Sequence, residues 1–264
     1  MNDSTHKIEL SKGIDKSTWD KIDLFCKNKS IVNIKTIISW ISLEFNIDIT
    51  VDPDIVKGYL QDWSNIKGSA IGLCRPKNDV EATIIIRVFY LTKIQYTISA
   101  GKTNLTGSAT PLDGFVLSVE NLKHVQPIVC NDKVNVSAGI YLEDMRNQVL
   151  SQSNNKYFYP VDPTSRREAM VGGTLSCNAS GFIPGDMGAT RYWVNALTFI
   201  LPNGYSIKCE RGQYISYKSH FILNNKKLTI PNYNRPKIKN ASGPYTCDVS
   251  EIDFIDFIIG SEGI

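Results

Sequence analysis

Two stretches of small, hydrogen-bonding residues are the parts of this sequence best suited to chemistry. The first, SAGKTNLTGSATP, covers residues 99–111, and the second, GGTLSCNASG, covers residues 172–181. Glycine tolerates positive φ angles and lets a ligand approach the backbone, so such a run after a strand can turn its amide N–H groups inward. A concave row of N–H donors suits phosphate. One run alone fits a plain surface loop equally well, but two runs flanking strands predict the two walls of a cleft around a diphosphate.

Other familiar chemistries lack their motifs. The sequence has no G-x-x-x-x-G-K-[ST] and no G-x-G-x-x-G, which excludes the P-loop and the Rossmann fingerprint. It has no G-x-S-x-G either, and this disfavours serine hydrolase chemistry. The six cysteines show no metal-ligand spacing and the three histidines are isolated, so we expect free thiols and no metal site.

The elements that must position the two runs can be read from periodicity and capping. Apolar residues at spacings of three and four predict a helix from an N-cap at Ser30 to Phe45. Asn78 and Glu81 form a capping box that starts a second helix, and residues 142–153 read as a third. Residues 1–28 are polar and read as loose at the start.

Strands are expected at residues 93–99, 114–119 and 133–139. A hairpin over residues 193–212 should turn at Pro202-Asn203-Gly204. Helices and strands alternate in the first half and strands dominate the second. The order predicts an α+β or mixed fold with two small lobes.

Composition sets further limits. The chain has 264 residues and a formal net charge of only +3, too little to argue for nucleic acid. No segment reaches the roughly 18 to 20 apolar residues of a membrane span, and the N-terminus lacks the apolar region of a secretory signal. We therefore expect a cytoplasmic protein.

Five separate motifs, in order, resemble those of one family. They are RPKNDVEAT, AGKTNLTGSATPLDG, FYPVDPTSRREAMVGGTLSCNASG, GATRYWVNALTFILPNG and IIGSEG. From residue 59 to the end the chain resembles the PCMH-type FAD-binding domain of the vanillyl-alcohol oxidase superfamily. Within it, the FAD-linked oxidases of the glycolate oxidase and D-lactate dehydrogenase group are the most similar branch.

The resemblance implies an α+β, two-lobed flavin domain with FAD between its lobes. Residues 1–65 would be a helical N-terminal extension, and residues 66–264 the domain itself. A small, mostly parallel sheet lobe would cover about residues 66–130, and a larger antiparallel lobe with flanking helices about residues 131–264. The substrate cap domain that follows in relatives is absent from the sequence.

The resemblance also implies the residues that hold FAD. The first run would wrap the pyrophosphate, the second would line the flavin and ribityl side, and Pro76 and Gly188 would lie close to the cofactor. The implied positions are Pro76, Ala100, Gly101, Lys102, Thr103, Asn104, Leu105, Thr106, Gly107, Ser108, Gly172, Gly173, Thr174, Cys177, Asn178, Ser180, Gly181 and Gly188.

Three departures from the family pattern bear on these expectations. Lys102 replaces a glycine, so the loop either keeps this side chain away from the cofactor or uses its ammonium for the diphosphate or an anionic substrate. Ser108 stands where a second glycine is common. Relatives with covalent flavin carry a histidine in this loop, and none occurs here, so non-covalent FAD is expected. Cys177 can also be read as a small buried packing residue.

Two classes of function stay open. The chain could be the flavin portion of an oxidoreductase that oxidises a small 2-hydroxy acid, D-lactate or glycolate, by hydride transfer to flavin N5. A companion polypeptide carrying the cap domain, or a missing tail, would then supply the base, and no catalytic residue can be assigned here. Alternatively it is an FAD-binding module without turnover. A third branch, UDP-N-acetylenolpyruvoylglucosamine reductase, is disfavoured by the FYPVDP and GSEG context.

Overall fold

A four-stranded sheet forms the centre of the first lobe. The computed structural model describes residues 6–27, 33–233 and 251–262. The sheet order is β2-β3-β5-β4, with β3, β5 and β4 parallel and β2 antiparallel to β3. The strands are β2 (Ile49–Thr50), β3 (Gly72–Cys74), β4 (Tyr96–Ser99) and β5 (Phe115–Ser118). β3 and β5 are buried throughout, which explains why they are short apolar runs without alternation.

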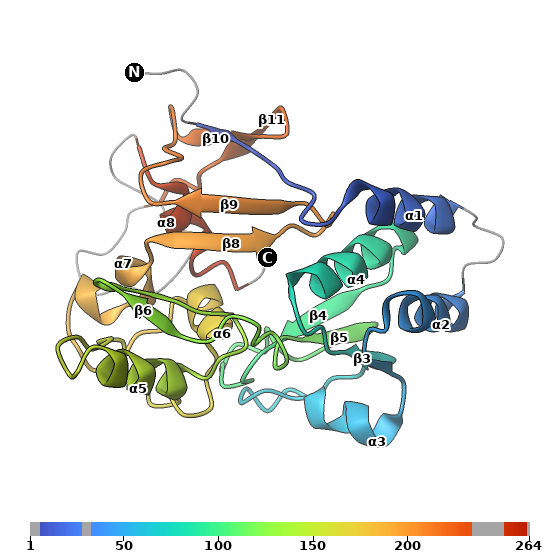
Figure 1. Cartoon of the computed structure of the whole chain (residues 1–264), viewed down its shortest axis with the longest axis horizontal. Helices are drawn as coiled ribbons and strands as arrows, with labels where there is room; N and C mark the ends of the chain where they lie inside the picture. Colours follow the sequence, from blue (N-terminus) through green and yellow to red (C-terminus); the bar gives the residue numbers. More distant parts are fainter. Residues whose placement is uncertain (1–5, 28–32, 234–250, 263–264) are drawn as a thin grey trace.

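Helices cover both faces of this sheet (Figure 1). α4 (Asp79–Thr92) packs on one face, with α1 (Lys16–Lys27) and α2 (Ile34–Phe45) beside it in the same core cluster. The short helix α3 (Pro53–Val56) and the 3-10 turn η1 (Lys57–Tyr59) lie on the other face, where Val56 packs against Leu73 and Val116.

The N-cap of α4 at Asn78 is confirmed, but the return bond expected for a capping box goes to Lys77 instead of Asn78. Asn78 Oδ1 accepts the Glu81 N–H at 3.0 Å, and Glu81 Oε2 accepts the amide N–H of Lys77 at 2.8 Å. The helix predicted after Ser30 starts later, at Ile34, with Asn33 as its N-cap. Ser30 itself lies outside the described residues.

The second lobe is built mainly from antiparallel pairs. β8 (Ala196–Ile200) and β9 (Ser206–Glu210) form the predicted hairpin, whose turn has Gly204 at φ 86°. β10 (His220–Leu223) pairs with β11 (Lys226–Thr229) and, in parallel, with β1 (Lys7–Ile8). The helix α8 (Phe254–Ile258) buries Phe254 against this core.

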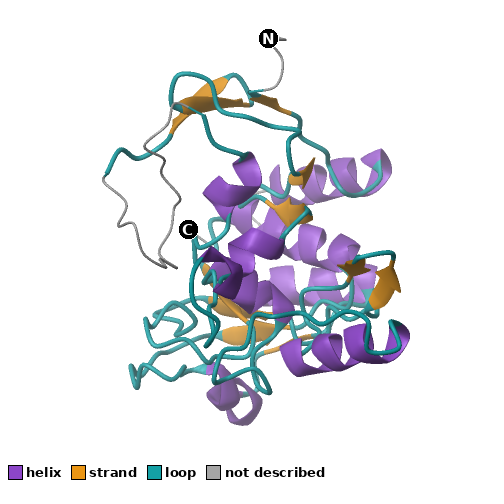
Figure 2. Cartoon of the chain, turned by 90° about the vertical axis from the view of Figure 1, so that its left-hand side faces the viewer, coloured by secondary structure: helices purple, strands orange, loops and turns teal. Residues whose placement is uncertain are grey.

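A smaller helical region completes the second lobe below the hairpin (Figure 1). A core of Ile140, Leu142, Met145 and Val171 holds it together. In the turned view the helices occupy the middle of the molecule, with strands above and below them (Figure 2). The elements of this region are β6 (Ile128–Cys130), β7 (Lys133–Asn135), α5 (Leu142–Gln152), α6 (Val171–Ser176), the 3-10 turn η2 (Asp186–Gly188) and α7 (Thr190–Trp193).

Parts of the element prediction were wrong. Residues 16–27 are a helix, because Trp19 and Ile22 form a buried stripe against α4 although the stretch is polar overall. β3 was not predicted, and the strand expected over residues 133–139 ends at Asn135. The α+β class and the mostly parallel first sheet are confirmed.

Candidate functional site

The first run leaves the sheet at the carboxyl end of β4. The neighbouring parallel strands β3 and β5 end at the same edge, so residues 100–108 lie beside Arg75, Pro76 and Glu120 at the ends of those strands. In open α/β sheets, ligands bind outside the carboxyl ends of parallel strands. Pro76, which is buried between β3 and α4, is therefore on the same edge as the run.

Asp62 organises the outer part of this loop. Its side chain, only 4% exposed, accepts the Asn104 Nδ2–H at 2.6 Å and the Ala109 amide at 3.3 Å. Burial raises the pKa of Asp62, but the hydrogen bonds from Ser64, Asn104 and Ala109 outweigh it and hold the pKa below its ordinary value. Asp62 is not among the positions implied from the sequence, because no local motif marks its contacts with residues 104 and 109.

Asn104 serves as the internal brace of the loop. Besides Asp62 it donates to Ser108 Oγ at 3.1 Å, and Thr106 Oγ1 lies within hydrogen-bond distance of Ser108 Oγ at 3.2 Å. The side chains of Leu105, Thr106 and Ser108 are exposed. The loop thus holds a fixed shape while its outer hydroxyls stay accessible.

Lys102 is turned away from the second run. It adopts a left-handed backbone at φ 55°, and its Nζ donates to Gly58 O at 2.7 Å over the ring of Tyr59. Burial lowers the pKa of this ammonium, and nearby Glu120 opposes the shift. Of the two roles considered for Lys102, this geometry favours the loop that keeps its side chain away.

The second run is a short helix rather than an open row of amides, and this corrects the expected nest. α6 starts at Val171, the Gly172 amide donates to Ala138 O at 2.9 Å, and the Thr174 amide donates to Met170 O at 3.0 Å. Tertiary packing overrides the low helix propensity of the two glycines here. Asn178, fully buried at φ 45°, ends the turn, and its Oδ1 accepts the Arg191 amide at 2.9 Å.

The two runs are in direct contact. A Cβ on Gly101 would lie 2.1 Å from Glu168 O, and a Cβ on Gly173 would lie 3.3 Å from the Ala100 Cβ. Only glycine at position 101 allows this approach of the two backbones. The runs therefore form one surface, as the diphosphate hypothesis required.

Residues 260–262 also contact the surface that the two runs form. Thr106 Oγ1 donates to Glu262 Oε2 at 2.9 Å, while the Glu262 amide donates to Ser176 O at 2.8 Å. The Gly260 amide donates to Leu175 O at 3.0 Å. Residues 260–262 of the GSEG motif therefore bridge both runs, and Gly263 lies outside the described residues.

Comparison with known proteins identifies this arrangement. The model of the FAD binding domain family matches residues 70–210, which is more than half of the chain. The chain belongs to this family. Both runs, and most of the contacts between them, fall within the matched residues of the FAD binding domain.

The relatives found by sequence are longer proteins. D-lactate dehydrogenase of Anaerostipes hadrus is 30% identical over 158 residues, covering 56% of this chain and 32% of that protein. Glycolate oxidase subunit GlcD of Bacillus subtilis is 29% identical, and the match covers 50% of this chain and 28% of that protein. Mitochondrial D-2-hydroxyglutarate dehydrogenase of Danio rerio is 26% identical, and the match covers 60% of this chain and 30% of that protein. The chain thus spans about a third of the length of the curated relatives it matches.

Solved structures support the fold. Alkyldihydroxyacetonephosphate synthase superposes with a TM-score of 0.56 at 14% identity, over 81% of this chain and 35% of that one. Glucooligosaccharide oxidase from Acremonium strictum superposes with a TM-score of 0.57 at 14% identity, over 67% of this chain and 36% of that one. At this identity the similarity concerns the fold alone.

The residues on this surface fit an FAD diphosphate. Within the described part of the chain, the Ser99 hydroxyl is buried and lacks a hydrogen-bond partner, at the start of the first run. Buried unpaired hydroxyls in native structures often face a ligand or water. The glycines at 101 and 172 are explained by close contacts within the protein, to Glu168 O and Ala138, so the buried Ser99 hydroxyl is the observation here that points to a ligand.

The remaining implied positions lie around the second run. The Gly181 backbone packs on that of Asp162, and the Gly181 amide donates to Gly188 O at 3.2 Å. Ser180 forms an isolated bridge with Ala189. The Cys177 thiol is half-buried, and burial together with the charge of Glu262 raises its pKa. This thiol therefore stays protonated at neutral pH.

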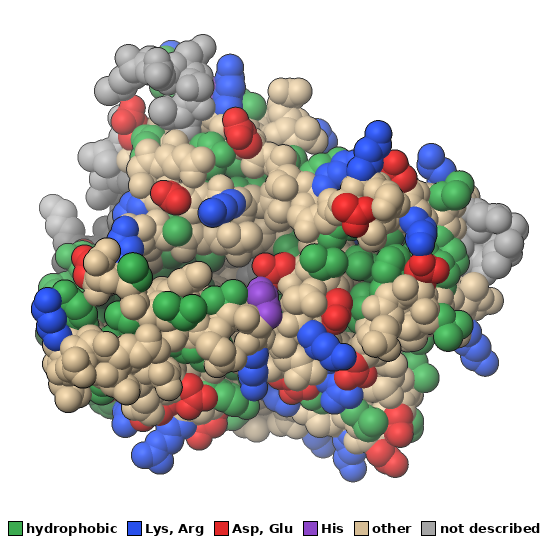
Figure 3. All heavy atoms as spheres, viewed as in Figure 1, with side chains coloured by type: hydrophobic (Ala, Val, Ile, Leu, Met, Phe, Trp, Pro, Cys, Tyr) green, Lys and Arg blue, Asp and Glu red, His purple; other side chains and the backbone are tan. Residues whose placement is uncertain are grey.

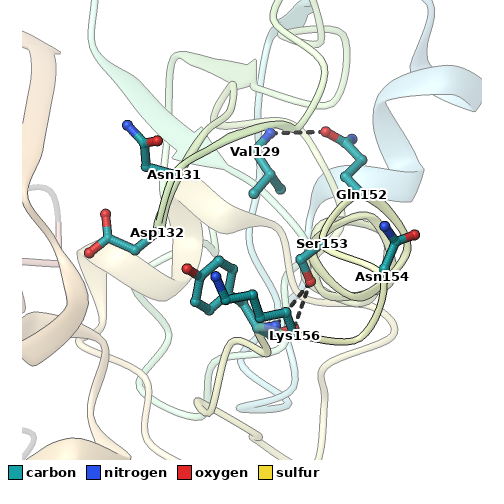
Figure 4. A pocket seen from close by; sticks show the side chains of 8 residues that line it. Val129, Asn131, Asp132, Gln152, Ser153, Asn154 and Lys156 are labelled. Carbon is teal, nitrogen blue, oxygen red and sulfur yellow. Dashed lines mark hydrogen bonds between the residues drawn. The ribbon is translucent and has the colours of Figure 1, made fainter.

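A separate polar cavity lies away from both runs (Figure 4). It has a volume of about 550 Å³ and opens between the β6–β7 turn and the end of α5. Its wall is fixed by Gln152 Oε1, which accepts the Val129 amide at 2.9 Å, and by Ser153 Oγ, which accepts the Tyr157 amide at 3.0 Å. None of its lining residues belongs to the implied FAD positions.

The described helices include none that is both long and apolar enough to cross a bilayer. On the face shown in Figure 3, basic and acidic side chains are interspersed.

Proposed function

We propose that this chain is the FAD-binding part of an oxidoreductase that oxidises a small 2-hydroxy acid. The observation that carries the proposal is the contact of the first run with Gly173 of the second run and, through Gly101, with Glu168 just before it, inside a matched FAD binding domain. The sequence relatives support the reaction class, because their names specify D-lactate, glycolate and D-2-hydroxyglutarate.

The residues implied from the sequence would hold the cofactor by backbone and small side chains. Residues 100–108 would carry the diphosphate, with Asp62 and Asn104 keeping that loop in shape. The segment from Gly172 to Gly188 would line the flavin side. Bound FAD would supply the redox chemistry as the acceptor, at N5, of a hydride from the substrate α carbon, while a base would take the hydroxyl proton and a 2-oxo acid would be left.

We assign no base to this chain. Among the implied positions only Lys102 and Cys177 titrate; Lys102 is bound to Gly58, and the raised pKa of Cys177 keeps it a thiol. A companion polypeptide that corresponds to the rest of the relatives would supply the base and the substrate cap. We place the protein in the cytoplasm, where its described cysteines, all free, stay reduced.

FAD is proposed to be dissociable. Neither run contains a histidine, and the one cysteine, Cys177, is half-buried with a raised pKa. Glucooligosaccharide oxidase from Acremonium strictum, by contrast, carries a 6-S-cysteinyl, 8α-N1-histidyl FAD. Precipitating the purified protein with acid should leave all flavin colour in the supernatant, and colour retained in the pellet would contradict the proposal.

The alternative is an FAD-binding module without turnover. It is favoured by the absence of an assignable base among the implied positions. Both candidates predict a yellow protein with an oxidised-flavin spectrum, so a colourless purified chain that takes up no added FAD would refute both.

Anaerobic reduction separates the two candidates. The chain is mixed, with and without the co-purified companion, with D-lactate, glycolate or D-2-hydroxyglutarate, and L-lactate serves as a control. Bleaching of the flavin by one of the first three acids supports the oxidoreductase. Flavin that dithionite bleaches and no 2-hydroxy acid does supports the module.

A further inference from the structure

The amide N–H groups of the first run have no acceptor within the described part of the protein. None of the described residues accepts a hydrogen bond from the amides of residues 101–108. The Ser99 hydroxyl, just before them, is buried and unpaired as well. Backbone N–H groups require a partner in the protein, in water or in a ligand. The first run therefore keeps its donors available, whereas in the second run the Gly172 amide is bound to Ala138 O.

Lys102, in the middle of these donors, has an unusual backbone. Its φ angle is 55°, in the left-handed region that is unfavourable for any residue with a Cβ. Lys93 is also left-handed, at φ 60°, but it closes α4, where its amide donates to Phe89 O. Lys102 lies outside the described helices and strands. Its conformation must therefore be held by contacts with other parts of the chain.

Residues 58–63 hold Lys102 at both ends. The carbonyl oxygen of Lys102 accepts the Trp63 amide at 3.1 Å, and its Nζ donates to Gly58 O at 2.7 Å. The same ammonium lies 4.5 Å from the centre of the Tyr59 ring, where a cation is attracted to the aromatic face. We name the three contacts with Gly58, Tyr59 and Trp63 the Lys102 clasp.

The clasp is anchored to the ends of the parallel strands. The Tyr59 hydroxyl donates to Glu120 Oε1 at 2.6 Å, just after β5. Arg75, just after β3, lies 3.9 Å from the same carboxylate and 2.9 Å from that of Asp48. The two acidic charges of this group balance those of Arg75 and Lys102. Lys102 is therefore better placed to fix the backbone of the first run than to attract an anion from a distance.

We propose that Lys102 is a positioning residue for the cofactor diphosphate, because its clasp holds the first run in the turn that presents the free amides to the phosphate oxygens. The inference rests on the proposed function and adds a task for a side chain that points away from the cofactor positions. Turns of this kind bring successive amides to face one anion. A loop that is already ordered loses less entropy when the ligand binds, so the clasp should increase affinity.

The affinity of the full chain for FAD and for ADP, measured by calorimetry after flavin removal, tests the proposal. Lys102→Met keeps the length of the side chain and loses its donor. It should raise both Kd values about ten-fold, which corresponds to one hydrogen bond from a charged donor. Lys102→Arg can still donate to Gly58 O and should restore most of the affinity. ADP reports on the diphosphate contacts without the flavin ring.

Lys93→Met is the matched control. Lys93 is left-handed too, and its Nζ lies 4.7 Å from the centre of the Tyr90 ring, but at the end of α4. Both Kd values of this variant should equal those of wild type. Wild-type affinity in Lys102→Met, equal losses at the two lysines, or no recovery in Lys102→Arg would each overturn the proposal.

Lys102→Gly covers the case in which the methionine variant does not fold. Glycine adopts the left-handed backbone without strain, so the variant removes only the side-chain part of the clasp. It should lose affinity for FAD and ADP as Lys102→Met does. Affinity equal to that of wild type would show that the clasp is not needed and would overturn the proposal.

Tyr59→Leu separates positioning from simple attraction by charge. It removes the ring beside the ammonium and leaves the charge of Lys102 in place. The Kd for ADP should rise about three-fold, and the substitution should add little to Lys102→Met, because both act on one clasp. An unchanged Kd in Tyr59→Leu would overturn the proposal. A wild-type chain that binds neither FAD nor ADP would refute the proposed function together with this inference, whereas equal binding by all variants would refute the inference alone.

Discussion

Gly101 is the residue at which the first run meets the backbone of Glu168, four residues before the second run. A Cβ there would lie 2.1 Å from Glu168 O, and backbone cannot move aside as a flexible side chain can. We expect Gly101→Ala to lower the free energy of unfolding by about 1–3 kcal/mol, as overpacking does, and to abolish FAD binding. Urea unfolding and flavin content measure the two effects.

Gly58→Ala is the matched control for that substitution. A Cβ on Gly58 would meet no heavy atom within 4 Å, and its backbone is not left-handed. Its free energy of unfolding should change by no more than about 0.5 kcal/mol. Equal losses in both variants would remove the close contact as the explanation.

The depressed pKa of Asp62 predicts how the free energy of unfolding depends on pH. Its pKa is depressed in the folded protein, so its contribution is complete above the ordinary value of 3.8 and is lost as the pH falls through the folded pKa. We expect Asp62→Asn to cost about 1–3 kcal/mol at pH 7, because three donors lose a charged acceptor. The difference in free energy of unfolding between Asp62→Asn and wild type should become smaller below pH 4.

Unfolding curves of wild type and Asp62→Asn at pH 7 and pH 3 show whether the stability difference shrinks in acid, as expected. Asp15, whose pKa is also lowered but whose partners lie within its own turn, provides the control. Asp15→Asn should leave the Asn104 loop and FAD affinity unchanged. A gap for Asp62→Asn that widens in acid would contradict the assignment.

At the scale of elements, α4 places Pro76 and the end of β3 beside the first run. Its start depends on the side chain of Asn78, which accepts the Glu81 amide. Asn78→Ala should lower the free energy of unfolding by about 1 kcal/mol, while Asn78→Asp keeps an acceptor and should restore most of it. If the aspartate variant is as unstable as the alanine variant, the cap is not the cause.

The elements that could be predicted from sequence are those with local causes. Asn78 and Glu81 lie within one turn of each other, and Pro202-Asn203-Gly204 forms the hairpin turn by its own backbone preferences. α6 could not be predicted, because its two glycines favour coil and only the amide bonds to Ala138 and Ile140 hold its first turn.

The candidate site likewise has features that could be predicted from the sequence and features that could not. Its two runs were recognisable from small-residue composition and motif order. Their contact at Ala100 and Gly173 could only be a hypothesis until the backbones were placed. Lys102 reaches Gly58 and Asp62 reaches Asn104, each across more than forty residues, and no local pattern encodes such partners.

For the whole molecule, FAD should act as a ligand that stabilises the folded state. A ligand at 100 times its Kd adds about 2.7 kcal/mol to the free energy of unfolding, which for a chain of this size raises Tm by about 5–10 °C. If the two runs grip the diphosphate, ADP should stabilise partially at higher concentration and riboflavin, which lacks phosphate, much less. Thermal unfolding with each compound measures this order, and riboflavin matching FAD would show that the diphosphate contacts contribute little to binding.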